Sequence, residues 1–422
     1  MPKSLAAASK SAWARVRPYP VQNVTVRNTA AEVDPREAGL TRAEVDEIWR
    51  SVERVYETRL HPAIGLCVRR HGKVVIDRTI GHVHGNAPED PADAPLLQAT
   101  PDTLFTAYSA SKAITAMVIH LLDERGQVHL DDPVAEYVPE FGRHGKEWIT
   151  LRHVLTHRAG IPAVPKSEVD LSLLSDSRRI FELLCDAKPT SPPGRRLAYH
   201  AITGGFVLGA VVEAVTGRDI RSFLRSEILD PLGFKHLSYG VEPEEIPLVA
   251  TNAFTGPPAI PPYSWVLEKS IGVTVRQAST LANDPAFLTS IVPSGNIVST
   301  ANEMSRYFEL LLRGGELDGT RVFQARTVRR AIAEQTFLEF DAVLVMPVRY
   351  GMGFMLGSKW LSLYGHDTPS AFGHLGFTSI LAYADRARDI SVSLMTSGKP
   401  FLTPEQIFWI QIPRTIARLT AK

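Results

Sequence analysis

The chain has 422 residues, 44% of them hydrophobic and 22% charged, which is ordinary for a soluble globular protein with an ample core. Lys and Arg number 46 against 45 Asp and Glu, so no overall field favours nucleic acid or an anionic membrane surface. The two cysteines, Cys67 and Cys185, are too few for a disulfide framework, and we interpret both as buried thiols in a reducing compartment.

The N-terminal segment carries lysines around a stretch of only three alanines. A secretory signal needs an apolar core of roughly 7–15 residues, and a membrane-spanning helix needs about 18 apolar residues in a row. The sequence offers neither, so we expect a cytoplasmic protein whose residues 1–30 form an N-terminal extension.

Two pairs of predicted strands lie near the two ends of the chain. Residues 63–70 and 73–79 flank the turn His71-Gly72, which predicts an antiparallel hairpin. Residues 378–384 and 390–396 form a second pair around a charged turn. Between the pairs, apolar residues recur at helical spacing in four segments: 109–125, 152–157, 203–215 and 220–229.

Glycine and proline divide the rest of the chain. Gly126 and Gly217 stand where two of the predicted helices should end. Residues 243–293 are rich in proline and poor in periodicity, so we expect a long irregular excursion that lines a binding cleft.

Strands at both ends with helices between them predict an α+β fold. In this fold a central antiparallel sheet, built from the N- and C-terminal segments and flanked by helices, carries an inserted and mostly helical lobe. We place the sheet domain at residues 31–125 and 290–422, and the lobe with its proline-rich excursion at residues 126–289.

A serine followed three residues later by a lysine opens the first of these helices. Residues three apart share a helix face, about 4.5 Å apart along the axis, so Lys112 points back at the hydroxyl of Ser109. The helix N-terminus adds positive potential and free N–H groups beside that oxygen. The motif alone is weak, because an N-cap serine and a solvated lysine give the same letters.

The same segment also contains Tyr108-x-x-x-Lys112, the arrangement found in short-chain dehydrogenases. That fold needs a glycine-rich dinucleotide loop after its first strand, and nothing before residue 100 supplies one. We therefore exclude a dehydrogenase and expect no cofactor.

Further segments, in order along the chain, resemble the class C β-lactamase and penicillin-binding-protein superfamily of serine hydrolases. The likeness spans roughly residues 60 to 400, and the motif pattern resembles that of the family VIII carboxylesterases most. The segments are residues 105–112 (FTAYSASK), 121–141, 149–162 (ITLRHVLTHRAGIP), 193–217, 227–234, 294–312 and 372–376 (FGHLG).

The resemblance implies roles for residues in three motifs. Ser109 would be the nucleophile, and Lys112 with Tyr199 of the second motif would carry its protons. His374 and Gly376 belong to the third motif, and the backbone N–H groups of Ser109 and Phe377 would form the oxyanion hole. Without the resemblance, a core tyrosine is the commoner interpretation of Tyr199.

The sequence departs from the β-lactamases at two of these motifs. Tyr199-His200-Ala201 replaces Tyr-x-Asn, and His374 replaces the lysine that attracts a β-lactam carboxylate. Both changes remove contacts that a β-lactam uses, whereas an ester requires only a nucleophile, proton carriers and oxyanion donors. We therefore expect hydrolysis of a small-molecule ester through an acyl-serine.

Three other readings stay open at this point: a β-lactamase, a D-amino-acid peptidase or other amide hydrolase or transacylase, and a catalytically silent scaffold. An α/β-hydrolase is excluded because the chain has no G-x-S-x-G elbow. Apolar residues in the least family-like segments suggest a hydrophobic acyl or alcohol group: Trp265, Val266, Trp360 and Leu361.

Histidines elsewhere receive structural interpretations. His82-Val83-His84 places two rings on one face of a strand, but no third ligand accompanies them, so we expect a loop or strand-edge role and no metal. His157 lies inside a family turn and is likewise interpreted as structural.

Overall fold

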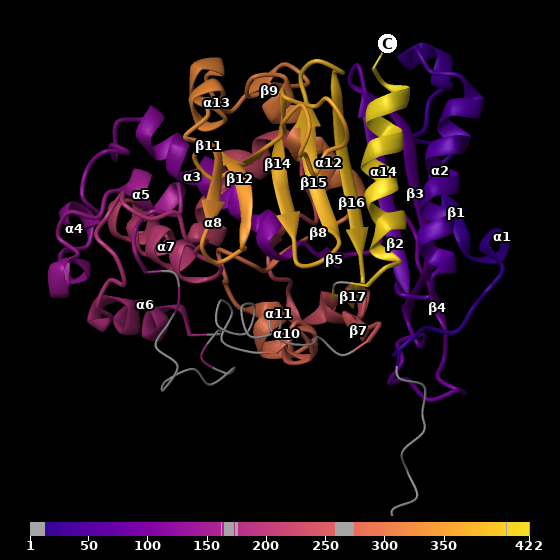
Figure 1. Cartoon of the computed structure of the whole chain (residues 1–422), viewed down its shortest axis with the longest axis horizontal. Helices are drawn as coiled ribbons and strands as arrows, with labels where there is room; N and C mark the ends of the chain where they lie inside the picture. Colours follow the sequence, from indigo (N-terminus) through magenta and orange to yellow (C-terminus); the bar gives the residue numbers. More distant parts are fainter. Residues whose placement is uncertain are drawn as a thin grey trace, which may run out of the picture.

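The computed structural model describes residues 13–161, 163, 173, 176–257, 274–401 and 403–421. Its centre is a large antiparallel sheet with the strand order β1-β3-β2-β16-β15-β14-β13-β12-β11 (Figure 1). The N-terminal part supplies β1 (Thr25–Arg27), β2 (Ala63–Arg70) and β3 (Lys73–His84). The C-terminal part supplies β11 (Thr336–Asp341), β12 (Met346–Tyr350), β13 (Met355–Leu356), β14 (Ala371–Gly376), β15 (Ile380–Asp385) and β16 (Ile390–Thr396).

The two ends of the chain meet at the antiparallel pair β2–β16, where Cys67 lies opposite Ser393. The predicted α+β fold, with a sheet built from N- and C-terminal segments, is thereby confirmed. The hairpin at His71-Gly72 also forms, and both residues have positive φ (52° and 78°), as a tight turn between twisted strands requires. One segment of the predicted extension joins the sheet, because Thr25–Arg27 pairs with β3 as an edge strand.

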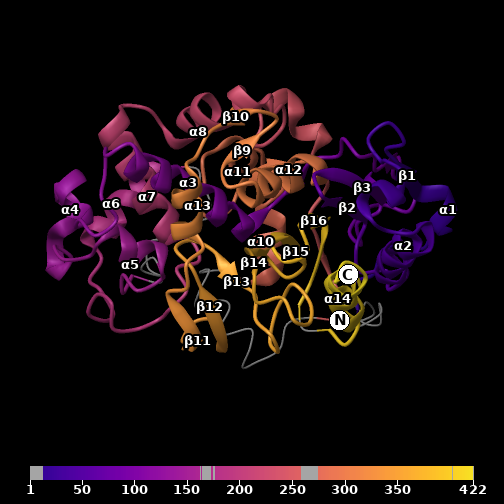
Figure 2. The same ribbon diagram turned by 90° about the horizontal axis from the view of Figure 1, so that it is seen from above.

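Helices cover both faces of the sheet (Figures 1 and 2). Helix α12 (Ala301–Leu312) packs on β2, β15 and β16. On the other face, α2 (Arg42–Glu57) packs against α14 (Gln406–Leu419). The side chains of β2 alternate between the two layers, since Leu66 joins the cluster of α2 and α14 while Cys67 joins the opposite one.

The inserted lobe is mostly helical, as the apolar spacing predicts. Gly126 and Gly217 both have φ of 69°, the left-handed conformation that ends a helix, at the two positions predicted for it. The helices that lead into the lobe and build it are α3 (Ser111–Glu124), α4 (Val134–Tyr137), η3 (Pro139–Gly145), α5 (Leu151–Leu155), α6 (Ser177–Asp186), α7 (Thr203–Thr216), α8 (Ile220–Leu224), η6 (Arg225–Leu229) and η7 (Asp230–Leu232).

The proline-rich stretch 243–293 is more regular than expected. Its residues 258–273 lie outside the described part, and the rest contains η8 (Pro243–Leu248), β7 (Ala253–Thr255), α10 (Val275–Leu281) and α11 (Pro285–Thr289). The expectation of a wholly irregular excursion is therefore wrong, because Thr274 caps α10 and Asp284 caps α11.

Short elements complete the described fold. Strand β8 (Ile297–Ser299) lies between β5 (Phe105–Thr106) and β6 (Ser238–Tyr239), and the helical turn η2 (Tyr108–Ala110) follows β5 directly. The others are α1 (Val21–Val24), η1 (Pro35–Ala38), β4 (Leu97–Gln98), β9 (Glu316–Leu317), β10 (Thr320–Arg321), α13 (Ala325–Ala331) and β17 (Gly398–Pro400).

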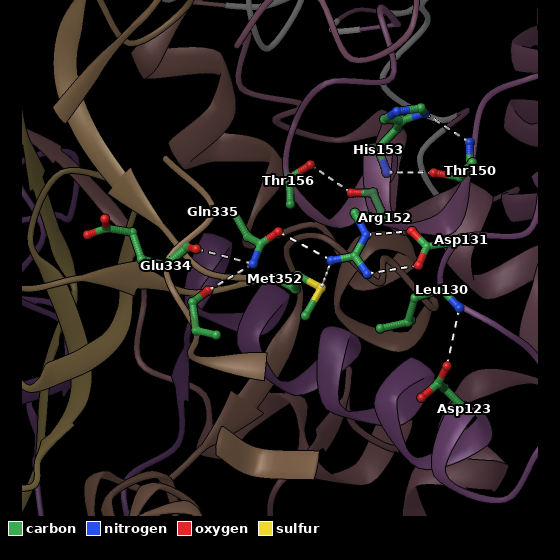
Figure 3. A network of polar contacts seen from close by, with 11 residues as sticks. Asp123, Leu130, Asp131, Thr150, Arg152, His153, Thr156, Glu334, Gln335 and Met352 are labelled. Carbon is green, nitrogen blue, oxygen red and sulfur yellow. Dashed lines mark hydrogen bonds and ion pairs between the residues drawn. The ribbon is translucent and has the colours of Figure 1, made fainter. Parts of the chain in front are cut away.

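Arg152 on α5 ties the lobe to the sheet domain (Figure 3). Its guanidinium binds both carboxylate oxygens of Asp131, at 2.6 and 3.0 Å. The same group donates to Gln335 Oε1 at 3.3 Å, just before β11, and to Met352 Sδ at 3.2 Å, just after β12. A fork-shaped donor thus fixes the lobe beside the edge hairpin β11–β12.

Both cysteines are free and buried, as expected. Burial raises the pKa of the Cys67 thiol to about 12 and that of Cys185 to about 11. Among the described residues, the structure contains no helix of the length and apolar character needed to cross a membrane.

Candidate active site

Ser109 lies in the turn η2, between strand β5 and helix α3. The turn begins with Tyr108 at φ 48°, a left-handed conformation that a bulky residue keeps only where its surroundings enforce it. On one side the N–H of Ala107 donates to the carbonyl of Ile297 at 2.7 Å. On the other side Gly376 of β14 is so near that an added Cβ would stand 2.2 Å from the carbonyl oxygen of Ala107. The turn is clamped between β8 and β14.

The side chain of Lys112 lies one helical turn beyond Ser109, as the three-residue spacing predicts. Its Nζ is 3.1 Å from Ser109 Oγ and donates to the carbonyls of Ala201 at 2.7 Å and Ser294 at 3.0 Å. The residue is only 8% exposed, and burial lowers the pKa of its amine from 10.5 to about 7. Near neutral pH a large fraction of Lys112 is therefore the uncharged amine, which can accept a proton.

Tyr199 lies in the segment before α7 and completes the group around Ser109. Its hydroxyl interacts with the side chain of Ser109, which partly offsets the effect of burial on the pKa of Tyr199, and Lys112 Nζ lies over its ring at 4.9 Å. Burial holds the pKa of Tyr199 well above its usual range. The phenol is consequently protonated at neutral pH, and Lys112 is the group of the pair that more readily gives up its own proton.

Three buried histidines surround Tyr199. The ring centres of His157 and His374 lie 4.7 and 6.2 Å from that of Tyr199, and His157 stacks on His200 at 5.7 Å. Burial, with the nearby Lys112 amine, lowers the pKa of His374 to about 3 and that of His200 to about 4. These rings are neutral at physiological pH and add no positive charge beside the nucleophile.

The residue that follows the third motif, Phe377, contacts the nucleophile turn. The ring of Phe377 stacks on Tyr108 with centres 5.3 Å apart, while Nζ of Lys399 lies over the same Tyr108 ring at 4.7 Å. No hydrogen bond within the described part of the chain uses the backbone N–H of Phe377. The oxyanion role expected for this N–H stays a prediction.

His374 does not take the place of a charged lysine. Its ring is buried, and its Nδ1–H donates to the carbonyl of Leu375 at 2.7 Å. No residue of the second motif replaces the asparagine of Tyr-x-Asn. Ala201, at the asparagine position, has only a methyl group, and Nε2 of His200 accepts the N–H of Ile161 at 3.2 Å. The site thus lacks both polar groups whose loss the sequence indicated.

Other predicted residues lie elsewhere. Trp360 and Leu361 are 78% and 54% exposed in the loop after β13, and Trp265 and Val266 lie outside the described residues. His84, at the end of β3, interacts with Thr251 and with the carbonyl of Pro247. Within the described ranges, no group of three or more His, Cys, Asp or Glu side chains could hold a metal ion.

Two contacts of the site were not predicted from the sequence. The carbonyl of Ser294, which binds Lys112, lies in a segment that the family likeness covers but to which no role was given. Asp341 accepts the backbone N–H of Tyr199 at 3.1 Å across 142 residues of chain. No sequence signal points to that contact, because a lone aspartate at the end of a strand is an ordinary turn residue.

Comparison with known proteins defines the class. Residues 51–411 match the family model described as Beta-lactamase, so the chain belongs to this family of hydrolases and has the β-lactamase/transpeptidase-like fold. It is 28% identical over 401 residues to esterase EstB of Burkholderia gladioli, covering 87% of this chain and 94% of EstB. The resemblance seen in the motifs is thereby confirmed.

Solved structures agree on the fold. A penicillin-binding protein homologue from Caulobacter crescentus aligns with a TM-score of 0.75 at 24% identity, covering 89% of this chain and 97% of the homologue. A family VIII carboxylesterase aligns with a TM-score of 0.73 at 24% identity, covering 88% of this chain and 96% of the other.

Proposed function

We propose that this serine hydrolase is a carboxylesterase that cleaves small-molecule esters through an acyl intermediate on Ser109. One observation carries the proposal: Lys112 Nζ, whose pKa is lowered to about 7, lies 3.1 Å from Ser109 Oγ. The carbonyls of Ala201 and Ser294 occupy the two N–H bonds of the neutral amine, which leaves its lone pair for the serine proton.

In the first step Ser109 Oγ attacks the ester carbonyl while its proton moves to Lys112. The carbonyl oxygen gains negative charge, which the backbone N–H groups of Ser109 and Phe377 stabilise. The tetrahedral intermediate then collapses, and the alkoxide leaves with the phenolic proton of Tyr199, which Lys112 replaces. The free alcohol departs, and Ser109 carries the acyl group.

In the second step water attacks the acyl group and gives its proton to Lys112 by way of Tyr199. Collapse of the second intermediate returns a proton to Ser109 Oγ and releases the carboxylic acid. The order of the two pKa values supports these assignments, because Lys112 takes protons near neutrality while Tyr199 stays protonated until it is needed as an acid. The sequence of steps needs no metal and no cofactor.

The composition of the site favours an ester over a β-lactam. His374 is neutral and bonded to its neighbouring carbonyl, so it offers no charge to a substrate carboxylate. Ala201 offers no amide at the position where class C β-lactamases carry asparagine. The EstB likeness supports the same choice.

The family match keeps β-lactam or amide hydrolysis as the second candidate. Rates on p-nitrophenyl butyrate, on the matched p-nitroanilide and on nitrocefin distinguish the three reactions, each measured for the wild type and Ser109→Ala. We expect the ester to be fastest and its turnover to disappear in the variant. A faster reaction of nitrocefin or of the anilide would overturn the preference, and no turnover of any substrate would favour a silent scaffold.

A further inference from the structure

Asp341 ends strand β11 at the edge of the sheet and is completely buried. Its Oδ1 accepts two N–H groups of its own turn, from Val343 at 2.8 Å and from Leu344 at 2.9 Å. The same oxygen accepts the N–H of Tyr199 at 3.1 Å. One carboxyl oxygen thus joins the turn between β11 and β12 to the backbone of the tyrosine beside Ser109.

The segment that holds Tyr199 has no helix or strand of its own, so its position depends on such contacts. The same hairpin turn supplies a second contact, from the N–H of Ala342 to the carbonyl of Leu197 at 3.0 Å. From the lobe side, the N–H of Ala198 donates to the carbonyl of His157 at 3.0 Å. Tyr199 therefore lies between the edge hairpin and the lobe.

The second oxygen of Asp341 has a different environment. Oδ2 is buried and has no hydrogen-bond partner among the described residues. The hydroxyl of Tyr350 is likewise buried without a hydrogen-bond partner among them. Burial raises the pKa of both Tyr199 and Tyr350, and the nearby carboxyl group of Asp341 contributes to the rise. A serine would cap the turn without placing a carboxyl group in the interior, so the turn alone does not account for the aspartate.

We propose that Asp341 is the positioning residue for Tyr199, holding it by the backbone at the distance from Ser109 that proton transfer requires. Asp341 does not touch the substrate in this arrangement, and its effect passes through Tyr199. The inference rests on the proposed function, in which Tyr199 carries protons to and from the leaving group.

Three replacements separate the two contacts of the Asp341 side chain, the one with its own turn and the one with the N–H of Tyr199. Asp341→Asn keeps an acceptor for all three N–H groups. Asp341→Ser keeps a short acceptor for the turn but does not reach Tyr199, and Asp341→Ala removes both. A matched control is Thr336→Val, which deletes a buried acceptor of the Tyr350 N–H, at 2.8 Å, in the same hairpin.

We expect Asp341→Ser and Asp341→Ala to lower kcat for p-nitrophenyl butyrate by about 10- to 100-fold, the usual cost of displacing a reacting group by about 1 Å, with KM nearly unchanged. Asp341→Asn should keep most of the wild-type kcat, because its amide oxygen can accept the same N–H groups. Thr336→Val should lower the Tm while leaving kcat within about twofold of the wild type. An equal loss of kcat in Thr336→Val would overturn the proposal, because hairpin stability would then explain the effect.

A double-mutant cycle with Tyr199→Phe gives the decisive readout. When the phenol is absent, Asp341→Ser should cost less than about twofold, because the group it positions is gone. A loss as large as in the wild type would show that Asp341 acts elsewhere.

The proposed ester function fails separately from this inference. If the wild type prefers the anilide or nitrocefin, ester specificity is wrong, and the same variants assayed on that substrate still decide the role of Asp341. If the wild type turns over none of the three, the rate at which a fluorophosphonate labels Ser109 replaces kcat. If Tyr199→Phe is as active as the wild type, Tyr199 carries no proton and the inference about Asp341 is wrong.

Discussion

Replacing Lys112 by methionine should change how stability depends on pH. Burial lowers the pKa of Lys112 from 10.5 to about 7, so between these values the unfolded chain binds one more proton than the folded chain. The free energy of unfolding therefore rises with pH in this window. The penalty for burying the amine is fully present below about pH 7 and disappears as the pH approaches 10.5.

The size of the effect follows from the same two values. A pKa difference of about 3.5 corresponds to about 5 kcal/mol at low pH, at 1.36 kcal/mol per pKa unit. From about pH 7.5 to about pH 9, roughly 2 kcal/mol of this penalty should disappear. Lys112→Met has no such group, but it leaves the carbonyls of Ala201 and Ser294 without their donor, a cost that does not depend on pH.

Urea unfolding of both proteins across this pH range measures the difference directly. The wild type should gain about 2 kcal/mol relative to Lys112→Met, because other titrating groups are common to both proteins. A difference that stays constant within about 0.5 kcal/mol, which is within the error of such extrapolations, would refute a depressed lysine pKa.

Three further outcomes follow from the geometry of the site and its support. The kcat/KM for p-nitrophenyl butyrate should rise with pH through an apparent pKa near 7, because only neutral Lys112 accepts the serine proton, and a flat profile would contradict this role. Gly376→Ala should lower kcat/KM by at least about 100-fold, because the new Cβ would stand 2.2 Å from the Ala107 carbonyl oxygen and push the turn η2 away from β14. A variant with wild-type kinetics would show that close contact with β14 does not position this turn. Arg152→Met should lower the free energy of unfolding, measured in urea, by about 1–3 kcal/mol. Asp131→Ala should lower it by less than about 1 kcal/mol, because the Asp131 carboxylate is 74% exposed. Equal losses in the two variants would show that the contacts of Arg152 with Gln335 and Met352 contribute nothing to stability.

Local patterns were sufficient for two hairpins of the sheet, β2–β3 and β15–β16, and for the contact between Ser109 and Lys112. The hairpin at His71-Gly72 follows from alternation around a turn, and the contact between Ser109 and Lys112 follows from helical spacing alone. Both depend on residues close in sequence, where geometry is set by backbone periodicity. Tyr199 needed the family resemblance, because its contact with Ser109 spans most of the lobe.

The contact that supports Tyr199 and the helices α10 and α11 were not predicted from the sequence, for physical reasons. Asp341 and Tyr199 come into contact only because β11 ends beside the segment before α7. An aspartate that caps a turn has the same sequence pattern whether or not it also accepts an N–H from a distant segment. The helices α10 and α11 were missed although Thr274 and Asp284 are good caps, because proline content was given more weight than capping.

The most direct test of the central claim is covalent labelling of the wild type with a fluorophosphonate, with residual hydrolysis of p-nitrophenyl butyrate followed in the same samples. Peptide mapping should find one label, on Ser109, and ester hydrolysis should fall in proportion to the labelled fraction. Hydrolysis that survives complete labelling of Ser109, or a label on a different residue that accounts for the lost activity, would contradict the acyl-Ser109 mechanism.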